Sequence, residues 1–325
     1  MTRVVVVTGA TSGIGRAAAL AFAARGDHLV LAARAPQTLA EVRAECAAAV
    51  AAAGAVTVET VPTDVTDPGA VDALARTALA RFGRIDVWVH TAAVMAYGRF
   101  DELPAEVFDQ VVRTDLLGAA AVARTALRRF RAAGGGTLVF TGSVLGHVTA
   151  PYMSGYVTSK WGLRGLVRVL QQECRDTPGV HVCLVSPGSV DTPVYQQAAN
   201  YLGRIGRPPP PVTTPERVAR AIVASVDRPR RETPVGKANL VLRFGFTVLP
   251  GLYDVLVGPL VRAAGLSRRP VAPHAGVVFA PDPTGEALRG GWRPDPVRAV
   301  RAPIRAGRAL LRRLGTDGRR SHRLG

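Results

Sequence analysis

Cysteine is scarce in this sequence: the 325 residues include three, at Cys46, Cys174 and Cys183. An odd number at wide spacing argues against a disulfide framework, and no pair has the close spacing of a zinc site. We therefore expect free thiols, no metal site and a chain that works in the reducing cytoplasm.

Long apolar runs are also missing. A helix needs roughly 20 predominantly apolar residues to span a bilayer. The nearest candidate, residues 239–261, is interrupted by Arg243, Pro250, Asp254 and Pro259. The first apolar run is short and leads directly into a glycine turn, which is unlike a secretory signal. The sequence therefore predicts neither a transmembrane helix nor a secretory signal.

Acidic residues are in deficit, because 24 Asp and Glu stand against 41 Lys and Arg, for a net charge of +17. Residues 289–325 hold eleven arginines and two aspartates, which leaves +8 for the preceding chain. A moderately basic globular protein with a basic tail explains this distribution better than a nucleic-acid-binding fold. We expect no nucleic-acid partner, and we interpret 289–325 as a largely disordered tail with one basic helix near 297–314.

Two kinds of segment alternate along the first two thirds of the chain. Short apolar runs rich in β-branched residues predict strands at 3–8, 28–33, 56–61, 85–90, 137–141 and 180–185. Helical patterning predicts helices at 13–25, 39–53, 69–81, 105–132 and 155–175. Because the two alternate and several of the strands are apolar at successive positions, we expect an α/β fold with a doubly wound parallel sheet, the Rossmann fold.

The pattern changes after residue 192. A further helix is predicted at 215–226, residues 240–266 are hydrophobic, and the chain beyond 265 is expected to be mostly irregular. We therefore predict a main domain at 1–230, a hydrophobic extension at 231–288 and the Arg-rich tail at 289–325.

A glycine-rich turn with the sequence TGATSGIG occupies residues 8–15, between the first predicted strand and the first predicted helix. Glycine permits a tight turn and the close approach of a pyrophosphate, whose charge the N–H groups of a helix N-terminus stabilise. Such turns are common in ordinary loops, so the signal depends on its position at the start of the βα alternation. In that position it predicts a dinucleotide cofactor.

The end of the second predicted strand bears on which dinucleotide binds. Dinucleotide folds usually place an acidic residue about 20 residues past the turn, where it binds the 2′-hydroxyl of the adenosine ribose. Here the position reads Ala33-Arg34, and a guanidinium binds a 2′-phosphate through charge-assisted hydrogen bonds. Arg16 is a candidate to assist. The alternative is that Arg34 merely begins a solvated loop, but we favour NADP(H) over NAD(H).

Ser143, Tyr156 and Lys160 form the candidate catalytic set. Tyr156 and Lys160 are four positions apart in a predicted helix and share a face. A phenol with a pKa of about 10 is a poor base at neutral pH. A neighbouring ammonium and the charge of an oxidised nicotinamide would lower this pKa, and Ser143 would donate to the substrate oxygen during hydride transfer. A lone Tyr-x-x-x-Lys is usually structural, so the hypothesis depends on the serine and the glycine turn that precede it.

Together these motifs resemble the short-chain dehydrogenase/reductase family over about residues 1–230. The family's glycine motif, its adenine-contacting aspartate, its catalytic residues and its nicotinamide-contacting segment match residues 8–15, Asp64, Ser143, Tyr156, Lys160 and residues 187–192. The resemblance implies a nicotinamide-dependent oxidoreductase that assembles as a homo-oligomer. The implied cofactor contacts are Thr8, Gly9, Thr11, Ser12, Gly13, Ile14, Gly15, Arg34, Asp64, Val65, Thr91, Ala92, Tyr156, Lys160, Pro187, Gly188, Val190 and Thr192.

Two positions depart from the family pattern. The family's Asn-Asn-Ala-Gly reads HTAA at residues 90–93, and its fourth catalytic residue, an asparagine in the central helix, aligns with Asp115. In the family that asparagine acts largely through its main-chain carbonyl, which an aspartate keeps. An ionised Asp115 would stabilise the charge of Lys160 and offset its effect on Tyr156. We expect activity to be retained; the alternative is a catalytically impaired NADP(H)-binding regulator.

The residues that flank these motifs are mostly apolar, which predicts a lipophilic ketone or secondary alcohol as substrate. The candidate pocket residues are Val94, Met95, Tyr97, Val144, Leu145, His147, Tyr152, Met153, Val194 and Tyr195. Residues 195–211 are expected to form a lid. The hydrophobic stretch 240–266 predicts either a helix pair packed on the body or on a second subunit, or a segment in peripheral contact with a membrane, with the basic tail attracted to anionic lipid.

Overall fold

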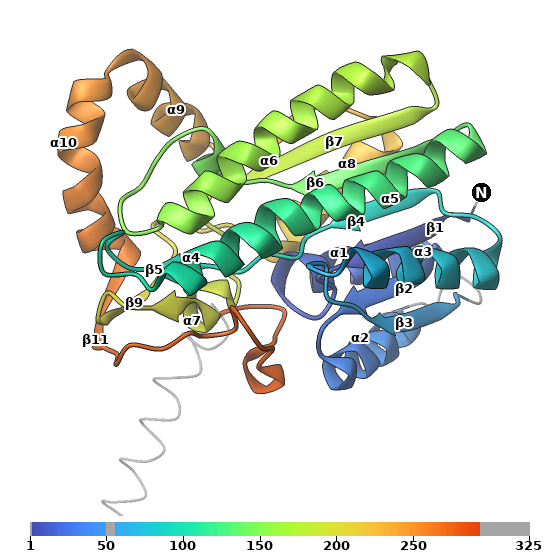
Figure 1. The fold of residues 1–325 in the computed structure, drawn as a ribbon, viewed down its shortest axis with the longest axis horizontal. Coiled ribbons are helices and arrows are strands. Elements are labelled where there is room, and N and C mark those ends of the chain that lie inside the picture. Colours follow the sequence, from blue (N-terminus) through green and yellow to red (C-terminus); the bar gives the residue numbers. More distant parts are fainter. Residues whose placement is uncertain (1, 50–55, 293–325) are drawn as a thin grey trace, which may run out of the picture. The chain divides into compact units, whose positions relative to one another are not determined.

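The computed structural model describes residues 2–49 and 56–292, and the chain up to Gly290 forms one compact unit. Its centre is a sheet of seven parallel strands in the order β10-β7-β6-β4-β1-β2-β3 (Figure 1). These strands are β1 (Val4–Thr8), β2 (His28–Ala33), β3 (Val58–Pro62), β4 (Val87–His90), β6 (Gly136–Thr141), β7 (Val180–Pro187) and β10 (Glu232–Val235). The predicted parallel sheet is confirmed. The pattern missed β10, an edge strand that contains a glutamate and a proline.

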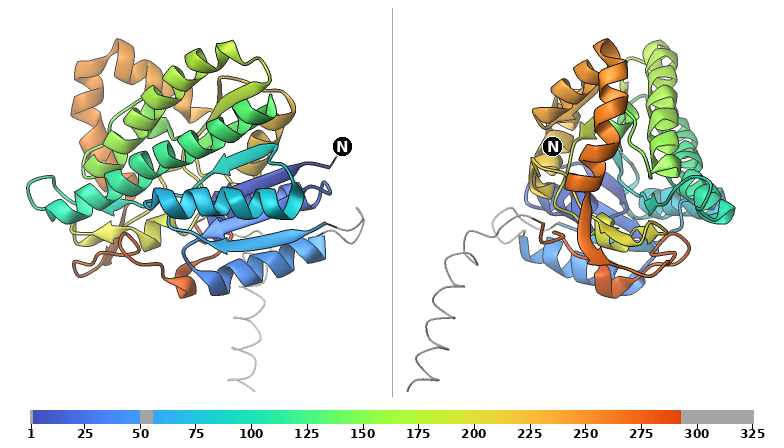
Figure 2. Two further views of the ribbon diagram at one scale, coloured as in Figure 1. Left: turned by 45° about the vertical axis from the view of Figure 1, so that its right-hand side comes forward. Right: turned by 90° about the vertical axis from the view of Figure 1, so that its left-hand side faces the viewer.

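Helices cover both faces of the sheet (Figures 1 and 2). One face carries α1 (Gly13–Ala23), α2 (Pro36–Ala49) and α8 (Pro215–Asp227), and the other carries α3 (Pro68–Phe82), α5 (Gly118–Ala133) and α6 (Ser154–Glu173). Successive residues of β1 point to opposite faces, so Val5 packs in the first layer and Val6 in the second. Full burial of such a valine stabilises the fold by about 1.5–3 kcal/mol. This two-sided burial is why central strands such as β1 and β4 are buried along their whole length.

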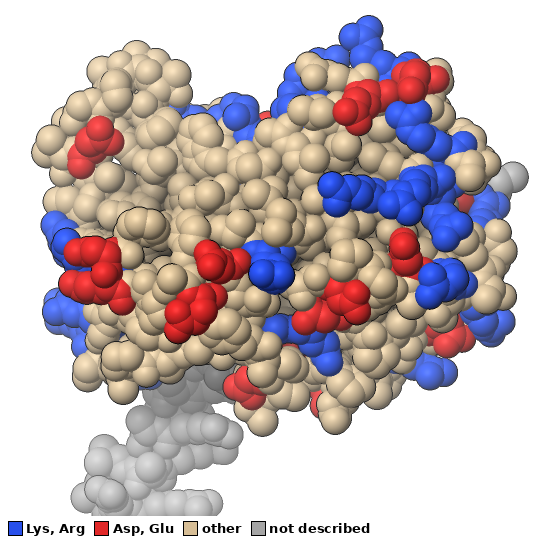
Figure 3. Space-filling view, in the orientation of Figure 1, with Lys and Arg blue, Asp and Glu red and all other residues tan. Residues whose placement is uncertain are grey.

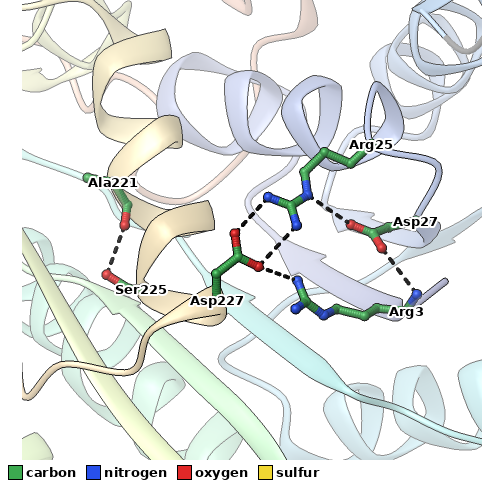
Figure 4. Close-up of polar contacts among 6 residues, drawn as sticks. All are labelled: Arg3, Arg25, Asp27, Ala221, Ser225 and Asp227. Carbon is green, nitrogen blue, oxygen red and sulfur yellow. Dashed lines mark hydrogen bonds and ion pairs between the residues drawn. The ribbon is translucent and has the colours of Figure 1, made fainter. Parts of the chain in front are cut away.

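An ion-pair cluster joins the end of α8 to the first strand and to the end of α1 (Figure 4). Asp227 accepts a hydrogen bond of 2.8 Å from Arg25 and another of 2.8 Å from Arg3. The backbone N–H of Arg3 in turn donates to Asp27 at 3.1 Å. The hydrogen bonds with Arg25 lower the pKa of Asp227. Because these groups are partly exposed, each pair contributes little by itself.

The long helix predicted at 105–132 is interrupted near its middle. It consists of α4 (Ala105–Val112), a π-helical turn η1 (Arg113–Leu117) and α5. The N–H of Gly118 bonds the carbonyl of Arg113, five residues earlier. The expectation of one regular helix was wrong, because a single wide turn leaves the apolar pattern on either side nearly unchanged. Asp115 lies within this turn.

The hydrophobic extension forms two helices, α9 (Ala238–Val248) and α10 (Pro250–Leu260), so the helix pair of the first alternative is present. After them β11 (Leu266–Pro270) pairs antiparallel with β9 (Arg204–Gly206). Beyond 265, β11 is a regular strand, whereas the described residues 271–292 are mostly irregular, as expected. The predicted helix at 297–314, nearly all of the basic tail and the end of the helix predicted at 39–53 lie outside the described residues.

Several findings bear on the expectations from composition. Cys46, Cys174 and Cys183 are free and buried. Within the described ranges, no helix is long and apolar enough to cross a membrane. In the same part of the chain, no three His, Cys, Asp or Glu side chains are grouped so that they could hold a metal ion.

Candidate active site

The carboxyl ends of the parallel strands open onto a cavity of about 750 Å³. This edge of a doubly wound sheet is where such folds bind their ligands. The cavity brings together most of the predicted site residues: Gly9, Thr11, Ser12, Gly13, Ile14, Gly15, Arg34, Asp64, Val65, Thr91, Ala92, Ser143, Tyr156, Lys160, Pro187, Gly188, Val190 and Thr192. Two predicted residues, Thr8 and Asp115, are buried behind this lining.

The glycine turn could not form with larger residues. Gly9 has a φ of +80°, and a Cβ added there would lie 2.5 Å from the backbone nitrogen of Ala92. A Cβ added at Gly15 would lie 2.0 Å from the carbonyl oxygen of Gly9. The turn thus packs backbone against backbone at the N-terminus of α1, beside the cavity. This cradle fits the pyrophosphate of a dinucleotide, which needs close backbone approach and helix N–H donors.

Residues at the end of β4 support the turn from behind. The hydroxyl of Thr91 donates to the carbonyl of Thr8 at 2.8 Å. The Thr8 hydroxyl and Nδ1 of His90 are hydrogen-bonded at 2.9 Å. Burial lowers the pKa of His90 to about 3, so the imidazole is neutral at physiological pH. Thr8 thus contributes to the predicted site through the backbone that it holds.

Tyr156 and Lys160 lie one turn apart near the start of α6, as their spacing predicts. The ammonium nitrogen of Lys160 is 5.2 Å from the centroid of the Tyr156 ring and 3.5 Å from the carbonyl oxygen of Thr141. Ser143 precedes the short helix η2 (Val144–Gly146), and its oxygen accepts the N–H of Leu145 at 3.1 Å. A hydrogen bond also links Ser143 with Tyr156.

Asp115 reaches the same group from the opposite side. One carboxylate oxygen accepts the N–H of Val94 at 2.7 Å, and the other lies 3.6 Å from the ammonium nitrogen of Lys160. Burial raises the pKa of Asp115 to about 6, although the charge of Lys160 and the hydrogen bond from Val94 oppose this rise. The π-helical turn thus delivers a carboxylate to Lys160.

In the chain alone the pKa of Tyr156 is raised, whereas the expected lowering requires the charge of an oxidised nicotinamide together with that of Lys160. Burial raises this pKa above its ordinary value, and the neighbouring charge of Asp115 raises it further. The hydrogen bond with Ser143 opposes both effects. The sequence pattern indicated the ammonium beside the phenol, but it did not reveal how far the phenol is buried. In the chain alone, Tyr156 is therefore protonated at neutral pH.

The far end of the cavity is apolar. Eight of the ten predicted pocket residues line it: Val94, Met95, Tyr97, Val144, Leu145, Met153, Val194 and Tyr195. His147 instead hydrogen-bonds Glu232, and Tyr152 accepts a hydrogen bond of 2.7 Å from Arg262. The helix pair also contributes to this lining, through Leu249, Leu252, Leu256 and Leu260, which the motifs did not indicate. Their apolar pattern was visible, but nothing local indicated that they face this cavity.

At the opposite end, Arg34 has partners that the sequence did not suggest. Its guanidinium donates to the carbonyls of Val277 at 2.7 Å and Val278 at 3.5 Å. Arg16, the candidate assistant, donates to Glu45 at 2.6 Å. Glu286 from the same C-terminal segment also lines the cavity. No local motif could have identified these residues, because the segment forms no α-helix or strand and its apolar residues follow no helical or strand period.

Comparison with known proteins agrees with this architecture. Residues 3–201 match the model of the short chain dehydrogenase family. The chain belongs to this family. It is 29% identical to the uncharacterized oxidoreductase YxnA of Bacillus subtilis, over 93% of this chain and 86% of that protein. It is 36% identical to a cis-4-hydroxycyclohexanecarboxylate dehydrogenase of Sinomonas cyclohexanicum, over 68% of this chain and 87% of that protein.

A solved structure gives the same result. An alcohol dehydrogenase from the archaeon Thermococcus sibiricus, complexed with 5-hydroxy-NADP, is 30% identical and superposes with a TM-score of 0.62. The match covers 72% of this chain and 95% of that one. This short-chain dehydrogenase is thus an oxidoreductase of a family that acts on small molecules, and its fold is one that binds a nicotinamide cofactor. Two residues that depart from the family pattern contact predicted site residues: His90 is hydrogen-bonded to Thr8, and Asp115 forms an ion pair with Lys160.

Proposed function

We propose that this short-chain dehydrogenase is an NADP(H)-dependent oxidoreductase that transfers a hydride between the nicotinamide and a lipophilic ketone or secondary alcohol. The observation that carries the proposal is the meeting of Ser143, Tyr156 and Lys160 on one cavity that begins at the glycine turn. The bound nicotinamide would supply or accept the hydride. The chain's own residues would then have to move one proton and stabilise one developing negative charge.

Tyr156 is the proposed general acid and base. Its raised pKa keeps the phenol protonated at neutral pH, which suits proton donation to the oxygen of a ketone during reduction. Ser143 donates a hydrogen bond to the same oxygen and stabilises its developing charge. Lys160 holds its positive charge beside the phenol, and Asp115 positions Lys160 through their 3.6 Å ion pair.

The choice of NADP(H) rests on Arg34, the cationic residue at the end of β2. An acidic residue at this position would repel a 2′-phosphate, whereas a guanidinium can bind it. The apolar lining at the far end of the cavity supports a lipophilic substrate, since an anionic substrate would meet few polar partners there.

Replacement of Tyr156 tests the catalytic proposal. Tyr156→Phe should lower turnover of a ketone panel by about a thousand-fold or more, because the proton donor is lost while the ring remains. Dissociation constants for NADPH, measured by its fluorescence, should change little. Unchanged turnover would remove Tyr156 from its assigned role.

A second candidate function is a catalytically impaired NADP(H)-binding regulator. The observation in its favour is Asp115, whose carboxylate raises the pKa of the proposed catalytic phenol. Wild-type chain that binds NADPH but turns over no member of a broad ketone and alcohol panel would favour this reading. Detectable turnover that depends on Tyr156 would exclude it.

We also propose that α9 and α10 contact a membrane surface from the cytoplasmic side. The pair exposes Leu240, Val241, Phe244, Val248, Leu252, Val255, Leu256 and Leu260. In Figure 3 the surface over these helices carries few charged side chains. Arg243 lies in α9 and Arg262 lies in the turn that directly follows α10, and bases beside an apolar helix face favour anionic lipid. Because α10 also lines the cavity, a lipophilic substrate could enter from the bilayer.

Vesicle sedimentation tests this contact. The wild-type chain should bind vesicles that contain phosphatidylserine, and Leu240→Gln/Val255→Gln should bind several-fold less because both side chains are exposed on the pair. Val169→Gln, which removes an exposed valine of α6, is the matched control. Equal sedimentation of all three would refute the contact. The homo-oligomer implied by the family remains a prediction, which light scattering without vesicles tests.

A further inference from the structure

The C-terminal segment 277–287 forms a second wall at the end of the cavity that Arg34 occupies. Pro281, Asp282 and Glu286 line the cavity. A shallow hollow beside Arg34 and Asp64 is bounded on its other side by residues 279–281. Val278 at the start of the segment is completely buried. The segment is therefore an integral part of this end of the cavity, where the proposed cofactor would place its adenosine.

This segment occupies donors that a phosphate would need. The guanidinium of Arg34 donates hydrogen bonds to the carbonyls of Val277 and Val278. At the N-terminus of α1, the N–H of Gly13 donates to the carbonyl of Ala287 at 2.9 Å, and the hydroxyl of Ser12 donates to it at 3.1 Å. Neutral carbonyls thus accept the hydrogen bonds of a guanidinium and of a helix N-terminus, which are both groups that bind phosphate readily.

The segment also brings a negative charge to the same end. One carboxylate oxygen of Glu286 accepts the hydroxyl of Thr11 at 2.7 Å. Its other oxygen is buried and has no hydrogen-bond partner among the residues that the structure describes. Glu286 is close enough for its charge to favour the protonated forms of both Arg34 and Arg16. A carboxylate in this position would repel a phosphate but could accept a hydrogen bond from a ribose hydroxyl.

We infer that Glu286 and the segment 277–287 determine cofactor specificity, and that they weaken the binding of a 2′-phosphate relative to a 2′-hydroxyl by opposing Arg34. The inference rests on the proposed function, which places the adenosine ribose beside Arg34. Cofactor preference in this chain is then a balance between a cation from the second strand and an anion from the far end of the fold. The glycine turn and Arg34 alone would overstate the preference for NADP(H).

Two adenosine fragments isolate this end of the cavity. Adenosine 2′,5′-bisphosphate and adenosine 5′-monophosphate differ only in the 2′-phosphate, and neither carries a nicotinamide. Calorimetry gives their dissociation constants for the full chain. Glu286→Gln should raise the preference for the bisphosphate by about five-fold, the effect of one partly screened charge at short range. Glu102→Gln removes an exposed carboxylate that pairs with Arg99 away from the cavity, and it should leave the preference unchanged.

The outcomes separate this inference from the proposed function. An unchanged or lowered preference in Glu286→Gln, with thermal unfolding like that of the wild type, would overturn the inference. Should the variant not fold, amide exchange of residues 277–287 in the wild type is measured with each fragment bound. Equal slowing of this exchange by the bisphosphate and by the monophosphate would overturn the inference. Wild-type preference for the monophosphate would instead contradict the proposed NADP(H) dependence, while a shift in Glu286→Gln would still support the inference.

Discussion

The two ends of the cavity differ in how far apart in the sequence their residues lie. At the catalytic end, Ser143 directly precedes η2, and Tyr156 and Lys160 lie on α6, so all three come from residues 143–160. At the adenosine end, Arg34 bonds a residue 243 positions away and Thr11 bonds one 275 positions away. The three catalytic groups are thus close in the sequence, although Lys160 also contacts Asp115, whereas the adenosine end is completed only when the C-terminal segment has docked.

This difference bears on how each property can change. A reaction whose groups come from one strand end and from the start of the next helix is encoded as a motif and is recognisable as such. Preference between two cofactors depends instead on charges from distant segments that meet in space. The same fold can therefore keep its chemistry while a terminal segment changes what it binds.

The largest expected loss of cofactor binding comes from a side chain placed in the glycine turn. Gly15→Ala should weaken NADPH binding by about a hundred-fold or more, because the added Cβ would lie 2.0 Å from the carbonyl oxygen of Gly9. Fluorescence titration with NADPH measures the loss. Gly165→Ala in α6 is the matched control, since no atom lies within 4 Å of its added Cβ. That control should keep NADPH binding and gain up to about 1 kcal/mol in stability. Normal binding by Gly15→Ala would show that the turn does not cradle the cofactor.

The same contrast explains what could be predicted from the sequence. The central strands were identified because two-sided burial leaves long apolar runs, and the glycine turn was identified because Gly9 and Gly15 are required by their own backbone contacts. Local patterns also placed Tyr156 and Lys160 on one face. The position of Glu286 could not be predicted, because it depends on docking of a segment with little periodicity.

Two further features could not be predicted for a different reason. The wide turn around Asp115 is invisible to periodicity, since the helices on both sides keep their apolar faces. The extent to which Tyr156 is buried, which raises its pKa in the chain alone, is also not visible in the sequence. Both features concern tertiary environment rather than residue type.

Reversal of the charge at Arg34 should have an effect of intermediate size on the adenosine end. Arg34→Asp should shift the ratio of kcat/KM for NADPH over NADH by about thirty-fold or more toward NADH, because a carboxylate repels the 2′-phosphate and accepts the 2′-hydroxyl. The variant also removes the donors to Val277 and Val278, so the segment 277–287 should exchange its amides faster. Arg99→Asp, an exposed change at a residue that does not line the cavity, is the control. An unaltered ratio would exclude Arg34 from the phosphate site.

The smallest expected effect lies at the catalytic end. Asp115→Asn should retain activity, because the backbone carbonyl stays in place and the amide oxygen can still accept the N–H of Val94. The carboxylate raises the pKa of Tyr156, so its removal should lower that pKa. Alcohol oxidation needs the phenolate, and its rise with pH should therefore begin up to about one unit lower.

The pH range of this difference is set by Asp115 itself. Its pKa is about 6, so below that pH the wild-type carboxyl is also neutral and the two log kcat profiles should converge. Since burial raises this pKa above its unfolded value, the wild type should also lose stability as the pH rises from about 4 through 6, and Asp115→Asn should not. Complete inactivity of a folded Asp115→Asn would mean that the carboxylate itself is required. The catalytic end would then depend on the π-helical turn as strictly as the adenosine end depends on its distant segment.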